Sequence, residues 1–185
     1  MSEPKKYKII YADPPWSYND KSLSRGGAER YYRTSHHSDI GRIDVQSVAD
    51  DDCILFMWAT FPKIAESLEL MKLWGFEYKT NAFTWIKTNK KSGTPFWGMG
   101  RWTRSNAEVC LLGVKGKPKR LDMGVHSVIH SAIRKHSEKP PETRDLILRL
   151  VGDLPRLEMF ARSAPDGWDV FGNEAPNSIE IRLKA

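Results

Sequence analysis

The sequence is poor in cysteine and contains no apolar run long enough to span a bilayer. Its two cysteines, Cys53 and Cys110, each lie inside a short apolar stretch. This placement is typical of buried free thiols and argues against a disulfide framework or a cysteine-ligated metal. Residues 1–6 lack the apolar segment of a signal peptide. Together these absences predict a cytoplasmic protein without a membrane span.

Repeats, low-complexity tracts and Pro/Gly/Ser-rich linkers are also missing. The 185 residues therefore fit one compact domain, long enough to bury a hydrophobic core without disulfides or structural metals. Five histidines are present, but no cysteine or acid joins them at the spacing of a metal motif, so we expect no metal site. Acidic residues are outnumbered, which gives a formal charge of +6 and favours a polyanionic partner.

A short strand followed by Asp13-Pro14-Pro15-Trp16 is the most informative segment. Residues 7–12 are apolar, β-branched or aromatic apart from one lysine, as in a buried strand. The two prolines stop the strand and stiffen the backbone just beyond its carboxyl end. Ligands of open α/β sheets bind in the crevice outside the strand ends, so these four residues are candidates for a site.

These residue types suit the binding of a planar exocyclic amine. The Asp13 carboxylate and the Pro14 carbonyl can each accept one amine hydrogen, and Pro15 adds no competing donor. The ring of Trp16 offers a face for a base to stack on, which is typically worth about 1–3 kcal/mol. Two acceptors can aim the nitrogen lone pair at an electrophilic methyl group, which fits methylation by a sulfonium donor. The alternative is a plain Pro-Pro turn with Trp16 as a plug in the core.

Strands and helices alternate along the rest of the chain. We expect strands over residues 52–59, 76–87, 107–115, 125–133, 156–160 and 168–171, and helices over residues 62–74 and 141–151. Pro62 suits a first helical position, and Gly75 and Gly152 each follow the last residue of a helix. The alternation predicts an α/β fold with a three-layer mixed sheet, and antiparallel strands toward the carboxyl end.

Two basic loops, residues 17–37 and 88–106, lie outside this scheme. Both combine lysine and arginine with glycine and aromatic residues. Basic groups neutralise phosphates and aromatic rings stack on bases, so both loops are candidate nucleic-acid contacts. The substrate-binding candidates around the second loop are Lys87, Arg101, Trp102 and Arg104. The alternative is a pair of solvated loops, each with one aromatic anchor.

Polar residues also follow the last two predicted strands. Arg162 could meet a carboxylate or a ribose oxygen, and Asn173 and Glu174 could meet an adenine edge or ribose hydroxyls. Gly172 would let the backbone approach a ligand closely. Taken alone, each of these residues also suits an ordinary turn or surface position.

In this order the motifs resemble the DPPW-type adenine N6-methyltransferase family. That family includes the catalytic subunit of the eukaryotic mRNA adenosine methyltransferase and many bacterial and phage relatives. The resemblance rests on DPPW (13–16), WIKTN (85–89), EVCLLGVKG (108–116), SEKP (137–140), FAR (160–162) and FGNE (171–174). These blocks span nearly the whole chain.

The resemblance implies a Rossmann-like methyltransferase with permuted motif order, formed by residues 1–185 as a single domain, and S-adenosylmethionine as its cofactor. It implies catalytic roles for Asp13, Pro14, Pro15 and Trp16. It makes Tyr18 a second wall for a flipped base. The implied cofactor contacts are Asp13, Ser137, Arg162, Asn173 and Glu174.

This sequence departs from the eukaryotic pattern at three positions. Ala107 stands where that pattern has a lysine, Ser163-Ala164 replace a His-Asn pair, and Glu174 replaces a glutamine. The cation that pairs with the cofactor carboxylate must therefore come from elsewhere. The candidates are Lys87, Arg134 and Lys135.

The leading hypothesis is methyl transfer to the N6 amine of adenine in nucleic acid. DNA is favoured because the short chain is similar to bacterial and phage members of the family, and RNA is the alternative. A catalytically silent nucleic-acid-binding subunit and a methyltransferase for a small molecule or a protein amide are further alternatives. The intact DPPW motif speaks against a silent subunit. Assembly as a homodimer or with a partner subunit is left open.

Overall fold

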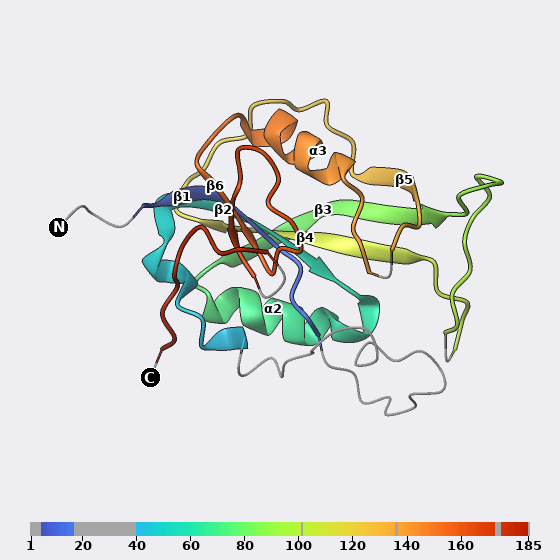
Figure 1. The fold of residues 1–185 in the computed structure, drawn as a ribbon, viewed down its shortest axis with the longest axis horizontal. Coiled ribbons are helices and arrows are strands. Elements are labelled where there is room, and N and C mark those ends of the chain that lie inside the picture. Colours follow the sequence, from blue (N-terminus) through green and yellow to red (C-terminus); the bar gives the residue numbers. More distant parts are fainter. Residues whose placement is uncertain (1–4, 17–39, 101, 136, 173–174, 185) are drawn as a thin grey trace.

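The computed structural model describes residues 5–16, 40–100, 102–135, 137–172 and 175–184. Strands make up most of its regular structure, and two α-helices and two short 3-10 helices connect them (Figure 1). The elements are β1 (Tyr7–Ala12), η3 (Val45–Ser47), β2 (Ala49–Ala59), η4 (Phe61–Lys63), α2 (Ile64–Leu73), β3 (Glu77–Thr88), β4 (Ala107–Lys115), β5 (Val128–Ala132), α3 (Glu142–Val151), β6 (Arg156–Met159) and β7 (Asp169–Phe171).

Seven strands form one mixed sheet in the order β5-β3-β4-β2-β1-β6-β7. β1 pairs in parallel with β2 and β6, β6 with β7, and β3 with β5. β4 is antiparallel to both of its neighbours, β2 and β3. The mixed sheet is therefore confirmed, but the placement of its antiparallel part is wrong. The carboxyl-terminal strands β6 and β7 are parallel to β1, and the reversed strand lies in the middle of the chain.

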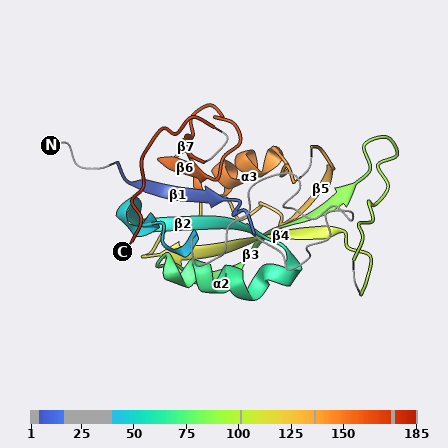
Figure 2. The ribbon, with the colours of Figure 1, turned by 60° about the horizontal axis from the view of Figure 1, so that its bottom comes forward.

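The two α-helices cover opposite faces of the sheet (Figure 2), which confirms the expected three layers. Leu70 and Met71 of α2 pack in one core cluster, and Ile147 and Val151 of α3 pack in the other. The strands between them are buried on both faces, as their continuous apolar runs predict. No described helix is long and apolar enough to cross a membrane.

Glycine ends both helices for the same backbone reason. Gly75 follows α2 with a φ of +84°, and Gly152 follows α3 with a φ of +94°. A side chain is strained at such angles, so these turns require glycine, and the chain can reverse there into the next strand. α3 ends at the predicted residue, and α2 ends one residue before the predicted one.

The direction of the strands gathers several chain segments at one edge of the sheet. The carboxyl ends of β1, β3 and β6 point to this edge, and the reversal of β4 brings its amino end there as well. We call it the catalytic edge, after the DPPW motif that follows β1 and for which the family resemblance implies a catalytic role. The loop of residues 89–106 projects beyond it, on the right in Figure 1.

Candidate functional site

At the end of β1 the chain turns sharply within the DPPW motif. The Asp13 amide donates to the Met159 carbonyl of β6 (3.5 Å), the last link of this strand to its neighbour. Two prolines follow that have no N–H to continue the ladder. The Trp16 amide then donates to the Pro14 carbonyl (2.9 Å), which closes a tight turn. A carbonyl oxygen has two lone pairs, so Pro14 keeps one acceptor site.

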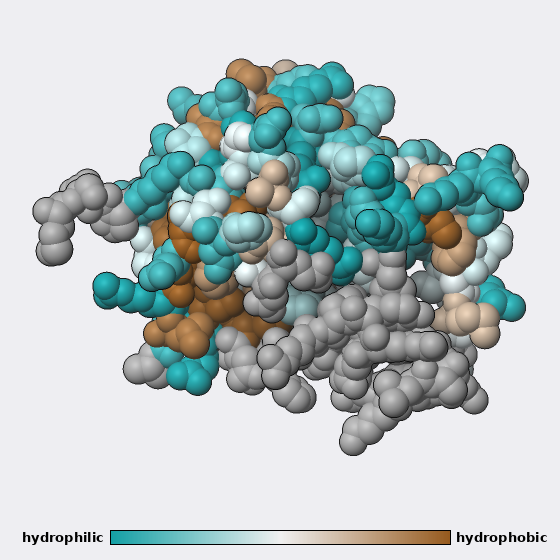
Figure 3. Space-filling model, viewed as in Figure 1, coloured by the Kyte–Doolittle hydropathy of each residue, from teal (hydrophilic) through white to brown (hydrophobic). Residues whose placement is uncertain are grey.

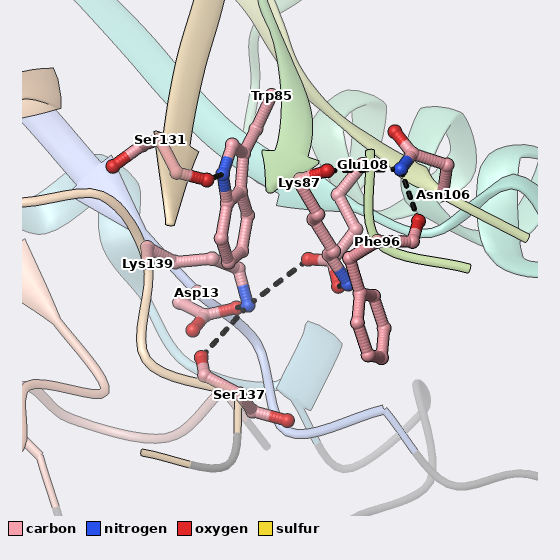
Figure 4. A network of polar contacts seen from close by, with 9 residues as sticks. All are labelled: Asp13, Trp85, Lys87, Phe96, Asn106, Glu108, Ser131, Ser137 and Lys139. Carbon is pink, nitrogen blue, oxygen red and sulfur yellow. Dashed lines mark hydrogen bonds and ion pairs between the residues drawn. The ribbon is translucent and has the colours of Figure 1, made fainter. Parts of the chain in front are cut away.

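A chain of charged side chains joins Asp13 to the start of β4 (Figure 4). The Lys139 ammonium lies 2.9 Å from Asp13 Oδ1 and 3.3 Å from Glu108 Oε2. It also donates to the Ser137 carbonyl (3.2 Å). The Lys87 ammonium lies 2.5 Å from Glu108 Oε1. Two lysines and two carboxylates thus alternate along one line at the catalytic edge. We call these four side chains, Asp13, Lys139, Glu108 and Lys87, the charged chain.

The two carboxyl groups of this chain have pKa values shifted in opposite directions. Loss of solvent raises the pKa of Asp13, and the nearby Glu108 adds to the rise; the Lys139 ammonium opposes it but does not cancel it. Burial would also raise the pKa of Glu108. Two ammonium groups, from Lys139 and Lys87, outweigh burial there and hold that pKa below its ordinary value. Pairs of acids separated in this way are characteristic of sites that handle protons.

Asp13 faces a cavity of about 350 Å³ that is lined by charges of both signs. Its wall includes Arg144, which grips Glu158 through two hydrogen bonds of 2.7 Å. Such a bidentate pair fixes both side chains and leaves the other charges to face a ligand. The charged groups on the wall are Asp13, Lys135, Glu138, Lys139, Arg144, Glu158 and Arg162.

Two residues of the cavity wall have strained backbones. Ser137 has a φ of 57° and Phe160 a φ of 62°, and no other described non-glycine residue has a positive φ. For a bulky residue such as phenylalanine this conformation is a genuine outlier, and strain of this kind gathers at ligand sites. The Phe160 ring stacks on Trp74, with ring centroids 6.4 Å apart, which anchors the strained turn in the core.

The chain matches the MT-A70 family over residues 7–174. It is also 40% identical to the type II methyltransferase M.MunI of a Mycoplasma species, over 96% of this chain and 82% of the relative. The chain belongs to the MT-A70 family. It is 31% identical to the human N(6)-adenosine-methyltransferase catalytic subunit METTL3, over 91% of this chain but only 28% of METTL3. The family and the Rossmann-like fold predicted from the ordered motifs are confirmed.

Three of the predicted cofactor contacts lie where this MT-A70 protein has its cavity. Asp13, Ser137 and Arg162 all line it, although they come from three separate parts of the chain. Tyr18, Arg101, Asn173 and Glu174 lie outside the described residues. Gly172 allows a close approach between two backbone segments of the protein, whereas the sequence suggested an approach to a ligand. A Cβ there would lie 2.4 Å from the Ala161 carbonyl oxygen.

The structure corrects the expected orientation of Trp16. Its side chain is only 4% exposed, and its indole N–H donates to the Trp58 carbonyl (3.4 Å). The turn that closes on Pro14 directs the ring inward, to the core cluster shared with α2. This placement corresponds to the alternative interpretation, a plug in the core. The ring presents no open face for a base, and its catalytic role stays a prediction.

The substrate-binding candidates around the second loop separate into two groups. Lys87 belongs to the charged chain, with its ammonium also 5.0 Å from the Trp85 ring. Trp102 and Arg104 lie on the projecting loop, where the Trp102 side chain is 99% exposed. The base of this loop is tied down, because the Asn106 side-chain amide donates to the Lys87 carbonyl (3.0 Å) and to the carbonyl of Phe96.

Sequence reasoning missed the cation that contacts Asp13. The structure places Lys139 against Asp13, a contact that we did not predict from the sequence. The candidates Lys87, Arg134 and Lys135 concern a different partner, the cofactor carboxylate, and stay predictions. Arg134 pairs with Glu138 (2.8 Å). A signal was present, since Lys139 stands in the SEKP block that carries the family resemblance.

Proposed function

We propose that this protein transfers a methyl group from S-adenosylmethionine to the N6 amine of adenine in DNA. The observation that carries the proposal is Asp13, held at the carboxyl end of β1 over a charged cavity and beside the remaining acceptor site of Pro14. Membership of the MT-A70 family and the similarity to named methyltransferases support the same reaction.

Asp13 and Pro14 supply acceptors for the two hydrogens of an adenine amine. The amine lone pair is delocalised into the ring, so drawing both hydrogens out of the ring plane makes the nitrogen a better nucleophile. Methylation leaves a surplus proton on that nitrogen. Asp13 is suited to accept it, because a carboxylate with a raised pKa holds a proton more tightly than an ordinary aspartate does.

The cavity suits the cofactor by the chemistry of its wall. S-adenosylmethionine supplies an electrophilic methyl group on a sulfonium, together with an amino acid carboxylate and ammonium. Lys135 and Arg162 can pair with that carboxylate, and Asp13 can accept from the ammonium. One of these two cations would then take the place of the lysine that is missing at Ala107.

DNA is the proposed polymer because M.MunI, a bacterial type II methyltransferase, matches this chain over most of both lengths. The METTL3 relatives, whose names specify adenosine, are matched over about 28% of their length. The projecting loop of residues 89–106 carries four cations and no acidic residue. Its surface mixes hydrophilic and hydrophobic groups (Figure 3), as contacts to phosphates and bases require.

The test uses labelled S-adenosylmethionine with DNA and RNA duplexes and single strands of matched adenine-containing sequence. Wild type should label DNA, and Asp13→Ala should lose at least about 100-fold in rate, as expected when a positioned acceptor is removed. Asp13→Asn keeps the shape without the charge and should lose activity as well. Asp51→Ala is the matched control, since Asp51 is fully exposed and its ion-pair partner Lys115 is 4.0 Å away.

Each alternative predicts a different result. Label in RNA but not in DNA would show that the enzyme is an RNA adenosine methyltransferase. No label in either polymer, with cofactor binding intact, would favour a silent subunit or a small-molecule enzyme. Full activity of Asp13→Ala would refute the assigned mechanism.

A further inference from the structure

A second cavity, of about 430 Å³, opens at the edge of the sheet opposite the catalytic edge. Its cationic wall combines Lys8 at the start of β1 with Lys117, Lys119 and Arg120, which follow the carboxyl end of β4. Figure 1 shows the segment after β4 leaving the sheet at the end away from the projecting loop and passing over α3. This cavity shares no residue with the cavity around Asp13.

The basic segment of residues 115–120 is held in a defined shape. Gly116 has a φ of +70°, and a Cβ there would lie 2.1 Å from the Asp51 carbonyl oxygen, so the segment packs directly on β2. The Lys117 amide donates to Asp52 Oδ1 (2.6 Å). At the far end the Leu121 amide donates to the Leu150 carbonyl (2.6 Å), which fixes the segment to the end of α3. The cations are therefore presented by a built wall.

The charge of this wall is largely uncompensated. Within the described residues, Lys8, Lys117, Lys119 and Arg120 form no ion pair, and Asp52 is the only carboxylate on the wall. Four cations against one carboxylate leave a local excess of three positive charges. The sequence KGKPKR (115–120) is also a dense basic stretch of the type that contacts nucleic acid.

Apolar side chains form the floor between these cations. Ile54 and Val151 are buried, and Leu154 lies beside them. A floor without acceptors, rimmed by exposed ammonium and guanidinium groups, suits a chain of phosphodiesters that rests its sugars on the floor and its charges on the rim.

We propose that this second cavity binds the phosphate backbone of a second segment of DNA, remote from the target adenine. The inference rests on the proposed function, because it assumes a DNA substrate. Lys8 near the start of β1 and Asp13 just after its end lie five residues apart, which separates the two edges by about 17 Å. A short duplex that lies across the strand ends at the catalytic edge is too stiff to bend round to the other edge, since the persistence length is about 150 base pairs. A long DNA reaches both edges.

The test compares the variant Lys119→Ala/Arg120→Ala with wild type on a duplex of about 15 base pairs and on linear DNA of several persistence lengths, about 500 base pairs. For the long DNA we expect a loss of at least about tenfold in affinity, since a second tethered site is removed. The slope of log K against the logarithm of the salt concentration should become shallower by about 2, one for each phosphate that the variant no longer neutralises. Affinity for the short duplex, and its methylation rate, should not change.

Two controls separate a local site from general charge. Lys72→Ala/Lys79→Ala removes the same two charges from exposed positions on α2 and β3, and should leave the long-DNA slope intact. Lys119→Arg/Arg120→Lys keeps both charges and should retain wild-type binding. Inorganic phosphate at constant ionic strength should not displace the long DNA.

Four results would overturn the proposal. These are an unchanged long-DNA slope in Lys119→Ala/Arg120→Ala, an equal loss in the Lys72/Lys79 pair, an equal loss on the short duplex, and full displacement by inorganic phosphate. Methylation of the short duplex by wild type tests the proposed function separately, so failure of one proposal is distinguishable from failure of the other.

Discussion

Replacing Lys139 with methionine tests whether one ammonium group holds the charged chain together. Lys139→Met keeps most of the side-chain volume but leaves Asp13 and Glu108 without the cation they share. Removing one partner of a fully buried ion pair costs about 3–5 kcal/mol. Here the Asp13 side chain is 29% exposed and Glu108 keeps Lys87, so we expect a loss of about 2 kcal/mol. For a chain of this length that lowers Tm by about 4–8 °C.

The loss of stability in Lys139→Met should depend on pH, and the two carboxyl groups give the direction of this dependence. The folded-state pKa of Asp13 is already raised, and without Lys139 it rises further. A raised carboxyl pKa destabilises the folded state above the unfolded value, near 3.9, and has no effect below it. Glu108 has a lowered pKa that stabilises the folded state at neutral pH, and this contribution also weakens without Lys139. The difference in the free energy of unfolding between variant and wild type should therefore be largest near pH 7 and should vanish toward pH 4.

Urea unfolding of wild type and variant across this pH range measures this difference directly. Lys139→Arg retains the charge and should lose much less. Lys79→Met removes a lysine whose partner Glu77 is exposed, and should change stability by less than about 0.5 kcal/mol. A difference that is independent of pH would refute the electrostatic reasoning, because loss of packing alone does not titrate.

Three further outcomes follow from burial and charge. Trp16→Ala should cost about 3–5 kcal/mol in urea unfolding, whereas Trp102→Ala should leave stability unchanged and weaken DNA binding by about 1–3 kcal/mol in a titration. Among the described residues the buried Thr143 hydroxyl has no hydrogen-bond partner, so Thr143→Val should raise the free energy of unfolding by about 1 kcal/mol. Glu108→Gln removes a charge that raises the pKa of Asp13, so the acid limb of the pH–rate profile should move to lower pH at saturating cofactor; an unmoved limb would contradict Asp13 as the acceptor.

Local sequence patterns were sufficient to predict most of the helices and strands. The predicted strand at residues 107–115 matches β4 at both ends, and the predicted helix at residues 141–151 matches α3 to within one residue. Continuous apolar runs and helix-ending glycines are short-range signals, so the sequence carries them directly. The strand expected at residues 125–133 is shorter, because only residues 128–132 pair with β3.

Contacts between distant segments were harder to predict. Asp13 and Lys139 are 126 positions apart, and nothing local to either residue indicates that they meet. Their contact depends on the order of the strands and on the turn after β5. The inward direction of Trp16 has a similar origin, since it depends on the packing of α2 against the end of β1. Periodicity identifies faces and lengths, whereas these choices are made by tertiary packing.

The reversal of β4 explains why this sheet has two charged edges of different character. Because β4 runs against its neighbours, its amino end delivers Glu108 to the edge where β1 and β3 deliver Asp13 and Lys87. Its carboxyl end delivers the basic segment of residues 115–120 to the opposite edge. If β4 were parallel, those cations would crowd Lys139, and Asp13 would lose the second carboxylate that raises its pKa. One reversed strand thus separates the basic segment from Asp13, so the two proposed roles, phosphate binding and proton acceptance, can be varied independently.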